Sequence, residues 1–384
     1  MRNTVFATTA AVALGVLSTS ASAQIKVGVT LSLTGPAASL GIPMRNAISL
    51  APKTIGGKTV EYVVLDDATD PTAARRNIER FVTDEKVDVI IGSSTTPNSL
   101  AMIEVAGRSK TPMISMGAGK AIIFPMDDNR RWAFKMPYND ATTAAATVRN
   151  MVSHGVKSVA TISVNDAYGE GWVREFRPLA EKAGINVVAS ELYAAKDTSV
   201  TGQILKIMSA KPDAVLVTGA GTVAALPQIA LAERGFKGKM YVTTGNVSAD
   251  YLRIGGKAVE GTLIAGAPMS VAMQVPDNHP AKAAAVSFAQ KYDAAFGAGT
   301  ASSFAGYVQD AILVLEAAIP VALKAGAPGS EAFRTALRDA IENSKGVQTT
   351  AGPVTMSPED HSGFSTDAPI MIEVKNGKFE AAGR

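Results

Sequence analysis

Small residues with hydroxyl groups recur in short segments that each follow an apolar run of strand character. The clearest is Ser93-Ser94-Thr95-Thr96, which comes directly after the run 87–92. Open α/β sheets bind ligands at the carboxyl ends of their parallel strands, so we expect these segments to form one site. The segments are 34–41, 93–96, 115–119, 165–168, 219–221 and 243–245.

The Thr95-Thr96 pair also opens a helical pattern over 98–109. The first amides of a helix have no partner within the helix, and together with nearby hydroxyl groups they form a natural site for an anion. Each charge-assisted hydrogen bond to a carboxylate there is worth about 1.5 to 3 kcal/mol. The pair therefore predicts a carboxylate site.

Residues that could perform catalysis or bind a metal do not assemble in the sequence. His154, His279 and His361 lie far apart, without the spacing of metal ligands, and we expect them to be solvated. Asp66 and Asp67 are adjacent on a strand and face opposite sides, which fits strand-end and turn acids better than a catalytic pair. With no G-x-S-x-G motif either, we expect no catalytic residue, no metal site and no enzyme. A periplasmic hydrolase, one alternative, would lack a nucleophile and a base.

Two glycine-rich segments resemble nucleotide-binding motifs. The segment 219–224 fits G-x-G-x-x-A, but the next strand ends in Thr243-Thr244 where a dinucleotide site requires an acid. The segment 117–120 is a partial phosphate loop that lacks the first glycine and a following Ser or Thr. Both are better interpreted as tight turns, and we expect no cofactor.

Residues 1–23 have the pattern of an export signal: Arg2 precedes an apolar run, and Ala21-Ser22-Ala23 suits signal peptidase. The run is too short for a membrane anchor, and the chain has no cysteine for a disulfide or lipid attachment. We therefore expect a periplasmic protein that does not itself span the membrane. Lys and Arg number 37 against 34 Asp and Glu, without the basic stripe of a nucleic-acid binder.

The elements that must position these segments alternate between strand and helix. Strand patterns over 25–33, 60–67, 87–92, 111–115 and 132–137 form a first series, and a second series runs from about residue 138 to 268. Alternation at this spacing predicts an α/β fold with two doubly wound parallel sheets. Helical patterns over 280–296, 302–324 and 330–344 follow without intervening strands, which indicates that they complete an earlier domain.

The sequence resembles a known family, the type I periplasmic solute-binding proteins of ABC transporters, in the leucine/isoleucine/valine-binding branch. The similarity covers essentially all of the chain after the signal. Its motifs are VGVTLSLTGPAASLG, LDDATDPTAA, IIGSSTTPNSLAMIEVAGRSKTPMIS, NDAYGEG and IGGKAVEGTL. The family fold has two lobes joined by three crossovers. This implies an N-terminal lobe of 24–137 plus 267–345 and a C-terminal lobe of 138–266 plus 346–384.

The resemblance also implies a set of ligand-binding residues between the lobes. Thr96 matches the hydroxyl residue that binds the ligand carboxylate, and Tyr168 matches a tyrosine of the second lobe that covers the ligand. The others line the wall, supply backbone contacts or match further pocket positions. The full set is Leu40, Ser94, Thr95, Thr96, Gly117, Ala118, Gly119, Tyr168, Ala220, Gly221 and Thr244.

This sequence departs from the family pattern at three of those positions. Thr244 stands where amino-acid binders commonly have an acid that pairs with the ligand ammonium, and a buried ammonium without such a partner is costly. Ala220 replaces a frequent aromatic residue, which leaves room for a ring, and Gly119 replaces a hydroxyl residue. We therefore expect an aromatic or other organic acid as ligand, with branched-chain amino acids as the alternative.

The function implied is that of a transport receptor. Ligand closes the lobes, and the closed form delivers the ligand to ABC permease subunits in the inner membrane. A ligand sensor for a signalling receptor is the second possibility, because it would use the same two-lobed clamp.

Overall fold

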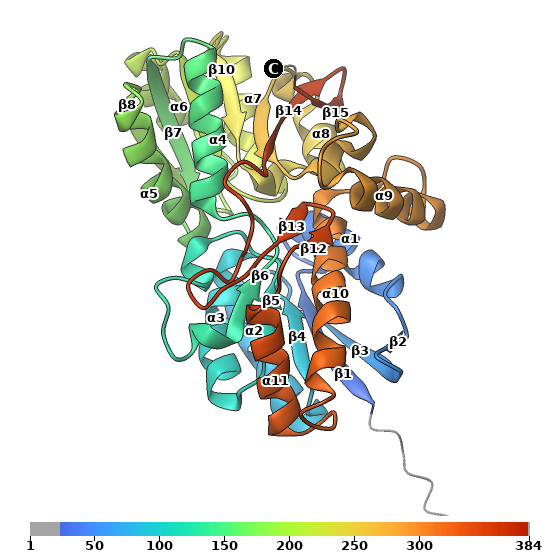
Figure 1. The fold of residues 1–384 in the computed structure, drawn as a ribbon. Helices are drawn as coiled ribbons and strands as arrows, with labels where there is room; N and C mark the ends of the chain where they lie inside the picture. The colour runs from blue at the N-terminus through green and yellow to red at the C-terminus, as the bar shows by residue number, and fades with distance from the viewer. Residues whose placement is uncertain (1–23, 383–384) are drawn as a thin grey trace, which may run out of the picture.

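The computed structural model describes residues 24–382, so the predicted signal segment 1–23 lies outside the described residues. Two α/β lobes are stacked one above the other, and each contains one sheet (Figure 1). The fold class predicted from the alternating pattern is confirmed.

The sheet of the first lobe has the strand order β2-β3-β1-β4-β5-β6. Its strands are parallel apart from the short antiparallel pair of β2 and β3. β1 is buried along its length, as expected for a strand covered by helices on both faces. The bounds are β1 Ile25–Leu31, β2 Thr54–Ile55, β3 Lys58–Asp66, β4 Val89–Gly92, β5 Met113–Ser115 and β6 Ala133–Lys135.

Helices cover both faces of this sheet. α1 (Ala38–Ser49), α10 (Ser303–Ala322) and α11 (Glu331–Glu342) belong to the core on one face. α2 (Pro71–Arg80) and α3 (Thr96–Ser109) form the core of the other face. Short helical turns link these elements: η1 Phe81–Glu85, η2 Lys120–Ile122 and η3 Arg130–Trp132.

The sheet of the second lobe has the order β15-β14-β11-β10-β9-β7-β8. Strands β7 to β11 pair in parallel, and β14 joins β11 antiparallel. The bounds are β7 Ser158–Val164, β8 Asn186–Tyr193, β9 Ala214–Thr218, β10 Lys239–Val242, β11 Leu263–Gly266, β14 Ile370–Lys375 and β15 Lys378–Ala381.

The helices of the second lobe also lie on two faces. The core on one face includes residues of α4 and α5, and the core on the other includes residues of α6, α7 and α8. Their bounds are α4 Asp140–Ser153, α5 Ala167–Lys182, α6 Thr201–Ala210, α7 Leu226–Glu233 and α8 Ala249–Gly255. The turns between them are η4 Thr222–Ala225, η5 Thr244–Asn246 and η6 Gly256–Val259.

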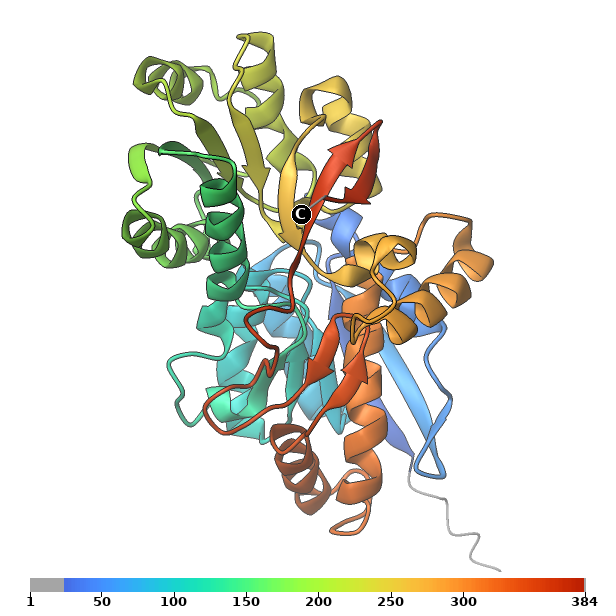
Figure 2. The ribbon, with the colours of Figure 1, turned by 45° about the horizontal axis from the view of Figure 1, so that its top comes forward.

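The chain passes between the lobes again after β11, through η7 (Pro268–Gln274) to α9 (Lys282–Phe296) on the first lobe. After α11 it forms the hairpin of β12 (Val347–Thr349) and β13 (Gly352–Val354). Figure 2 shows this hairpin beside the first lobe and β14 in the second.

The third crossover lies later than the predicted position near 346. Val354 and Met356 are fully buried in the core that also contains β1, and Ala368 packs against the same core. These apolar side chains hold residues 347–368 on the first lobe, although we expected all of 346–384 in the second. We therefore propose lobes of 24–137 plus 267–368 and of 138–266 plus 369–384.

Among the described residues, α10 is a helix whose length and apolar composition would allow it to cross a membrane. Its apolar window is 67% buried inside the protein, against α1 and α11 among others. The apolar character of α10 is thus explained by its place in the core of the first lobe.

Candidate functional site

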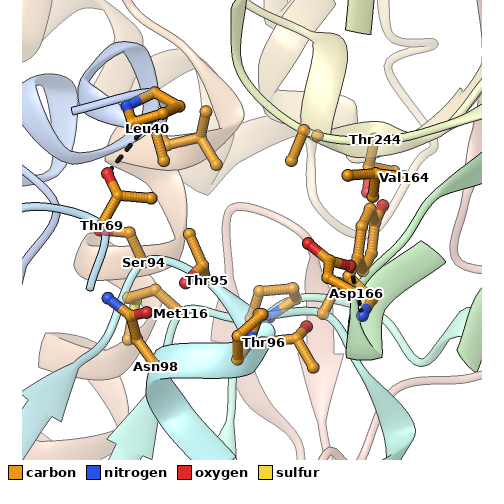
Figure 3. Close-up of a pocket in the computed structure, with 18 of the residues that line it drawn as sticks. Leu40, Thr69, Ser94, Thr95, Thr96, Asn98, Met116, Val164, Asp166 and Thr244 are labelled. Carbon is orange, nitrogen blue, oxygen red and sulfur yellow. Dashed lines mark hydrogen bonds between the residues drawn. The ribbon is translucent and has the colours of Figure 1, made fainter. Parts of the chain in front are cut away.

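A cavity of about 200 Å³ lies between the two sheets, at the carboxyl ends of their strands (Figure 3). This volume is below the usual range for ligand pockets, about 300 to 1,000 Å³, which suits a small molecule. First-lobe turns contribute Pro36, Ala37, Leu40, Thr69, Ser94, Thr95, Thr96, Pro97, Asn98, Met116, Ala118 and Pro137, and α10 adds Phe304 and Tyr307. Second-lobe turns contribute Val164, Asp166, Tyr168, Ala195, Ala220, Val223, Thr244 and Gly245.

Most of the residues predicted from the sequence line this one cavity. They come from turns that are far apart in the chain and belong to both lobes. Those that line it are Leu40, Ser94, Thr95, Thr96, Ala118, Tyr168, Ala220 and Thr244.

The predicted glycines Gly117, Gly119 and Gly221 are not among the lining residues. Their backbone amides donate to protein acceptors: Gly117 to the Ser115 hydroxyl at 2.9 Å, Gly119 to the Thr96 hydroxyl at 3.0 Å, and Gly221 to a carbonyl at 3.1 Å. In this arrangement the amides of Gly117 and Gly119 stabilise the wall, and the predicted backbone contacts from this segment to a ligand stay a prediction.

The amino end of α3 lies at the cavity, which Thr95, Thr96 and Asn98 help to line. Thr95 is the N-cap residue, yet its side chain makes no capping hydrogen bond. The Thr95 hydroxyl is buried and has no hydrogen-bond partner. A buried donor and the open first turn of a helix are thus available together, which is an arrangement that favours an anion.

The buried Asp67 side chain connects the first-lobe segments that follow β1 and β4. Its carboxylate accepts hydrogen bonds from Ser32 at 2.7 Å, Ser93 at 2.5 Å and Asn98 at 2.8 Å. Burial raises the pKa of Asp67, and the hydrogen bonds from Ser93 and Ser32 oppose that rise. Asp66 closes the neighbouring turn by accepting from the Leu33 amide at 2.9 Å. The two acids serve the scaffold, as the sequence indicated.

The second-lobe wall is built on the amino end of α5. The Asp166 side chain accepts from the amides of Tyr168 and Gly169 and so caps this helix. Burial raises the pKa of Asp166, while those two amide bonds lower it. Tyr168 is 5% exposed, and its hydroxyl group has no hydrogen-bond partner. This wall therefore holds a carboxylate and a buried tyrosine hydroxyl group.

Several lining residues were missed in the sequence. Asp166 stands in the predicted turn 165–168, from which we selected only Tyr168 as a site residue. Phe304 and Tyr307 come from the long helix α10, far along the chain from the turns that line the cavity, and only the three-dimensional packing reveals them. Met116 lay inside the predicted segment 115–119, where we selected only its small neighbours.

The expectation that the histidines are solvated is wrong for His361, which is fully buried. Its ring stacks on Phe134 at a centroid distance of 4.3 Å. Its Nε2 lies 3.1 Å from a Glu342 carboxylate oxygen, and its Nδ1 lies 2.8 Å from the Ala133 carbonyl. This ring fastens the segment after β13 to the first sheet. Groups of His, Cys, Asp and Glu that could hold a metal are absent from residues 24–382.

Direct contacts join the two lobes around the cavity. The Lys120 ammonium lies 3.3 Å from the Glu175 carboxylate, and the Thr222 amide donates to the Pro36 carbonyl at 3.4 Å. Ala118 of the first lobe packs against a second-lobe core. Ala220 packs against core clusters of both lobes. The structure thus presents the lobes in contact with each other.

The two-lobed architecture and the inter-lobe cavity agree with comparisons to known proteins. A model of the family described as "periplasmic binding protein" matches residues 24–378. The Leu/Ile/Val-binding protein BraC3 of Rhizobium johnstonii is 27% identical over 371 residues, which cover 94% of this chain and 95% of that protein.

Solved structures show the same similarity. An extracellular ligand-binding receptor from Rhodopseudomonas palustris HaA2 superposes with a TM-score of 0.90 at 42% identity, covering 94% of this chain and all (100%) of that one. A solute-binding protein of an ABC transporter from R. palustris, solved with benzoate, has a TM-score of 0.78 at 24% identity and covers 94% and 96%. Members of this family are non-enzymatic periplasmic proteins that work with small-molecule ligands and ABC permeases. This chain belongs to the periplasmic binding protein family, in its type I, Leu/Ile/Val-binding branch.

Proposed function

We propose that this protein captures a small carboxylate ligand between its lobes and delivers it to an ABC permease in the inner membrane. The observation that carries this proposal is the amino end of α3, where the Thr95 hydroxyl is buried without a partner beside the cavity. A ligand carboxylate would accept a hydrogen bond from this hydroxyl and face the free first amides of the helix.

The proposed ligand is an aromatic or other organic acid. Thr244 supplies no negative charge for an α-ammonium group, and Ala220 is a small residue on the second-lobe wall. Leu40 and Phe304 add apolar surface to the cavity. The benzoate bound by one structural neighbour supports this class, because that neighbour has the same fold.

Branched-chain amino acids remain the second candidate. The curated relative BraC3 is named for leucine, isoleucine and valine, and it covers nearly the whole of this chain. Apolar cavity walls would suit an aliphatic side chain as well as a ring. The ammonium group of such a ligand would then need a partner other than Thr244.

Delivery requires that the permease distinguish the loaded form. A ligand shifts the equilibrium toward closed lobes only if it contacts both, and the cavity draws its walls from both. A sensor that docks on a signalling receptor would use the same closure. A permease or ATPase gene beside the gene for this protein would support transport.

A thermal-shift screen of the protein from residue 24 onward tests the proposal. The panel contains benzoate, 4-hydroxybenzoate, a short aliphatic acid, leucine, isoleucine and an uncharged amide. A ligand at 100 times its Kd adds about 2.7 kcal/mol of stability, which raises the melting temperature visibly. Shifts with aromatic acids but not leucine support the proposed class. Shifts with leucine alone restore the amino-acid alternative, and the absence of any shift with carboxylates overturns the proposal.

A further inference from the structure

The two carboxylate oxygens of Asp166 have different environments. Oδ1 accepts the amide of Tyr168 at 2.8 Å and the amide of Gly169 at 2.9 Å. Among the described residues, Oδ2 receives no hydrogen bond, and the residue lines the cavity. Figure 3 shows the side chain of Asp166 directed from the second-lobe wall toward the space in front of Thr95. One oxygen therefore holds the helix and the other is open to a ligand.

No cation balances this carboxylate inside the cavity. Lys, Arg and His are absent from the side chains that line it within residues 24–382, and Asp166 is the one Asp or Glu among them. The charged group on its own helix that acts on Asp166 is Glu170, which is also acidic. A ligand carboxylate at Thr95 would face a second negative group across a small, poorly hydrated space.

A hydrogen-bond donor on the ligand would change that balance. A hydroxyl or ammonium group facing Oδ2 would replace the water that this oxygen loses when the lobes close on a ligand. A ligand without a donor would leave a buried carboxylate oxygen without a partner, which is strongly unfavourable. The Asp166 carboxylate thus favours ligands that carry a hydrogen-bond donor over ligands that lack one.

We propose that Asp166 is a specificity-determining residue whose free oxygen accepts a hydrogen bond from the ligand, so that the preferred ligands are small carboxylates that also carry a hydroxyl or ammonium donor. This inference rests on the proposed function, because it takes the ligand carboxylate to lie at the amino end of α3. It adds a second recognition point in the opposite lobe. Hydroxy acids and amino acids both carry such a hydrogen-bond donor, and the experiment below distinguishes between these two classes of ligand.

Asp166→Asn changes the free atom without removing the cap. The Asn side-chain oxygen caps a helix about as well as Asp, and the group in the place of Oδ2 becomes an amide donor. The matched control is Asp70→Asn. Asp70 caps α2 by accepting hydrogen bonds from the amides two and three residues further on, Thr72 and Ala73, as Asp166 does in α5, but it does not line the cavity. Any general effect of an uncharged cap is therefore present in both variants.

Calorimetric titration of the parent and both variants uses three probes: benzoate, 4-hydroxybenzoate and leucine. We expect a donor-bearing probe to bind the parent at least tenfold more tightly than benzoate. Asp166→Asn should weaken that probe about tenfold or more and strengthen benzoate, because a like charge is removed and a donor is added. Asp70→Asn should leave all Kd values unchanged. Whether 4-hydroxybenzoate or leucine shows the effect identifies the hydroxyl or the ammonium group as the donor.

The outcomes separate this inference from the proposed function. If benzoate binds the parent as tightly as the donor-bearing probes and Asp166→Asn changes all of them equally or not at all, the inference is wrong while carboxylate binding stands. If none of the three probes binds the parent, the proposed ligand site and the role of Asp166 both fall.

Discussion

The backbone amide of Gly119 donates a hydrogen bond of 3.0 Å to the side-chain hydroxyl of Thr96. This contact joins the segment after β5 to the first residue of α3. A Cβ atom at position 119 would lie 2.4 Å from the Thr96 methyl carbon. The departure from the family pattern at Gly119 is therefore explained by the close approach of the Thr96 side chain.

Gly119→Ala should displace Thr96 and weaken ligand binding at least tenfold, since the added methyl group occupies the space of the Thr96 side chain. Isothermal titration with the ligand found in the screen measures the change. Gly202→Ala is the control, because a Cβ there meets no atom within 4 Å. Gly202 is exposed in the first turn of α6, so this substitution should leave affinity unchanged while adding up to about 1 kcal/mol of stability. Equal affinities in both variants would contradict the proposed role of Thr96.

The adjacent threonines should respond differently to replacement by valine. Thr95→Val removes a buried hydroxyl without a partner, so the free protein should be as stable as the parent or more stable, while ligand binding weakens by about 1 to 3 kcal/mol. Thr96→Val also removes the acceptor of the Gly119 amide, so both stability and binding should fall. Melting temperatures with and without ligand measure both effects. Unchanged ligand-induced shifts in both variants would place the carboxylate elsewhere.

Gly221 of the second lobe lies close to Pro36 of the first lobe. Its φ is +77°, and a Cβ would lie 2.4 Å from the Pro36 carbonyl oxygen of the opposite lobe. Gly221→Ala should therefore impede closure and accelerate ligand release at least tenfold in a stopped-flow experiment. Gly256→Ala carries a similar backbone strain, with φ +49° and open space around its Cβ. It should cost stability and leave the release rate unchanged; equal release rates in the two variants would show that steric contact with Pro36 does not limit closure.

Asp310 should make the stability of the protein depend on pH. It is fully buried, and burial raises its pKa to about 7, although the Thr350 amide donates to it at 2.6 Å. A folded-state pKa above the unfolded value means that the folded form holds the proton more tightly, so stability is lost as the pH rises from about 4 to about 7. Asp310→Asn should remove this loss, at up to about 1.4 kcal/mol per pH unit in that window.

Urea unfolding of the parent and of Asp310→Asn at pH 4.5, 6 and 7.5 measures the difference. We expect the free energy of unfolding of the variant to rise relative to that of the parent at each higher pH. The difference between the two should level off above pH 7. A gap that is constant over this range would mean that Asp310 is ionised throughout.

Much of the fold follows from the sequence because local signals agree with the tertiary structure. The predicted strand runs 25–33 and 60–67 correspond to β1 and β3. Asp70 and Pro71 are a typical cap and first-turn pair, and α2 begins with them. Helix α1 was not predicted. Its residues 38–49 follow a turn motif, contain Pro43 and have no side-chain cap, so no local signal marks its start.

The site was predictable only where its residues lie in turns at strand ends. Thr96 and Tyr168 have this position, and both line the cavity. Tyr307 enters the cavity from a long apolar helix, where its sequence neighbours indicate nothing but core. The late third crossover was missed for a related reason: Val354 and Met356 are apolar in the sequence, but which lobe buries them depends on packing with α10 and β1.

The contacts of Ala118 and Ala220 have a thermodynamic consequence. Each of these small apolar residues packs against a core of the opposite lobe, so separating the lobes exposes apolar protein surface to water even when no ligand is involved. Removing apolar surface from water lowers the heat capacity. If the ligand closes the lobes as proposed, its capture carries a more negative heat-capacity change than its own burial would produce, and the binding enthalpy becomes more exothermic as the temperature rises.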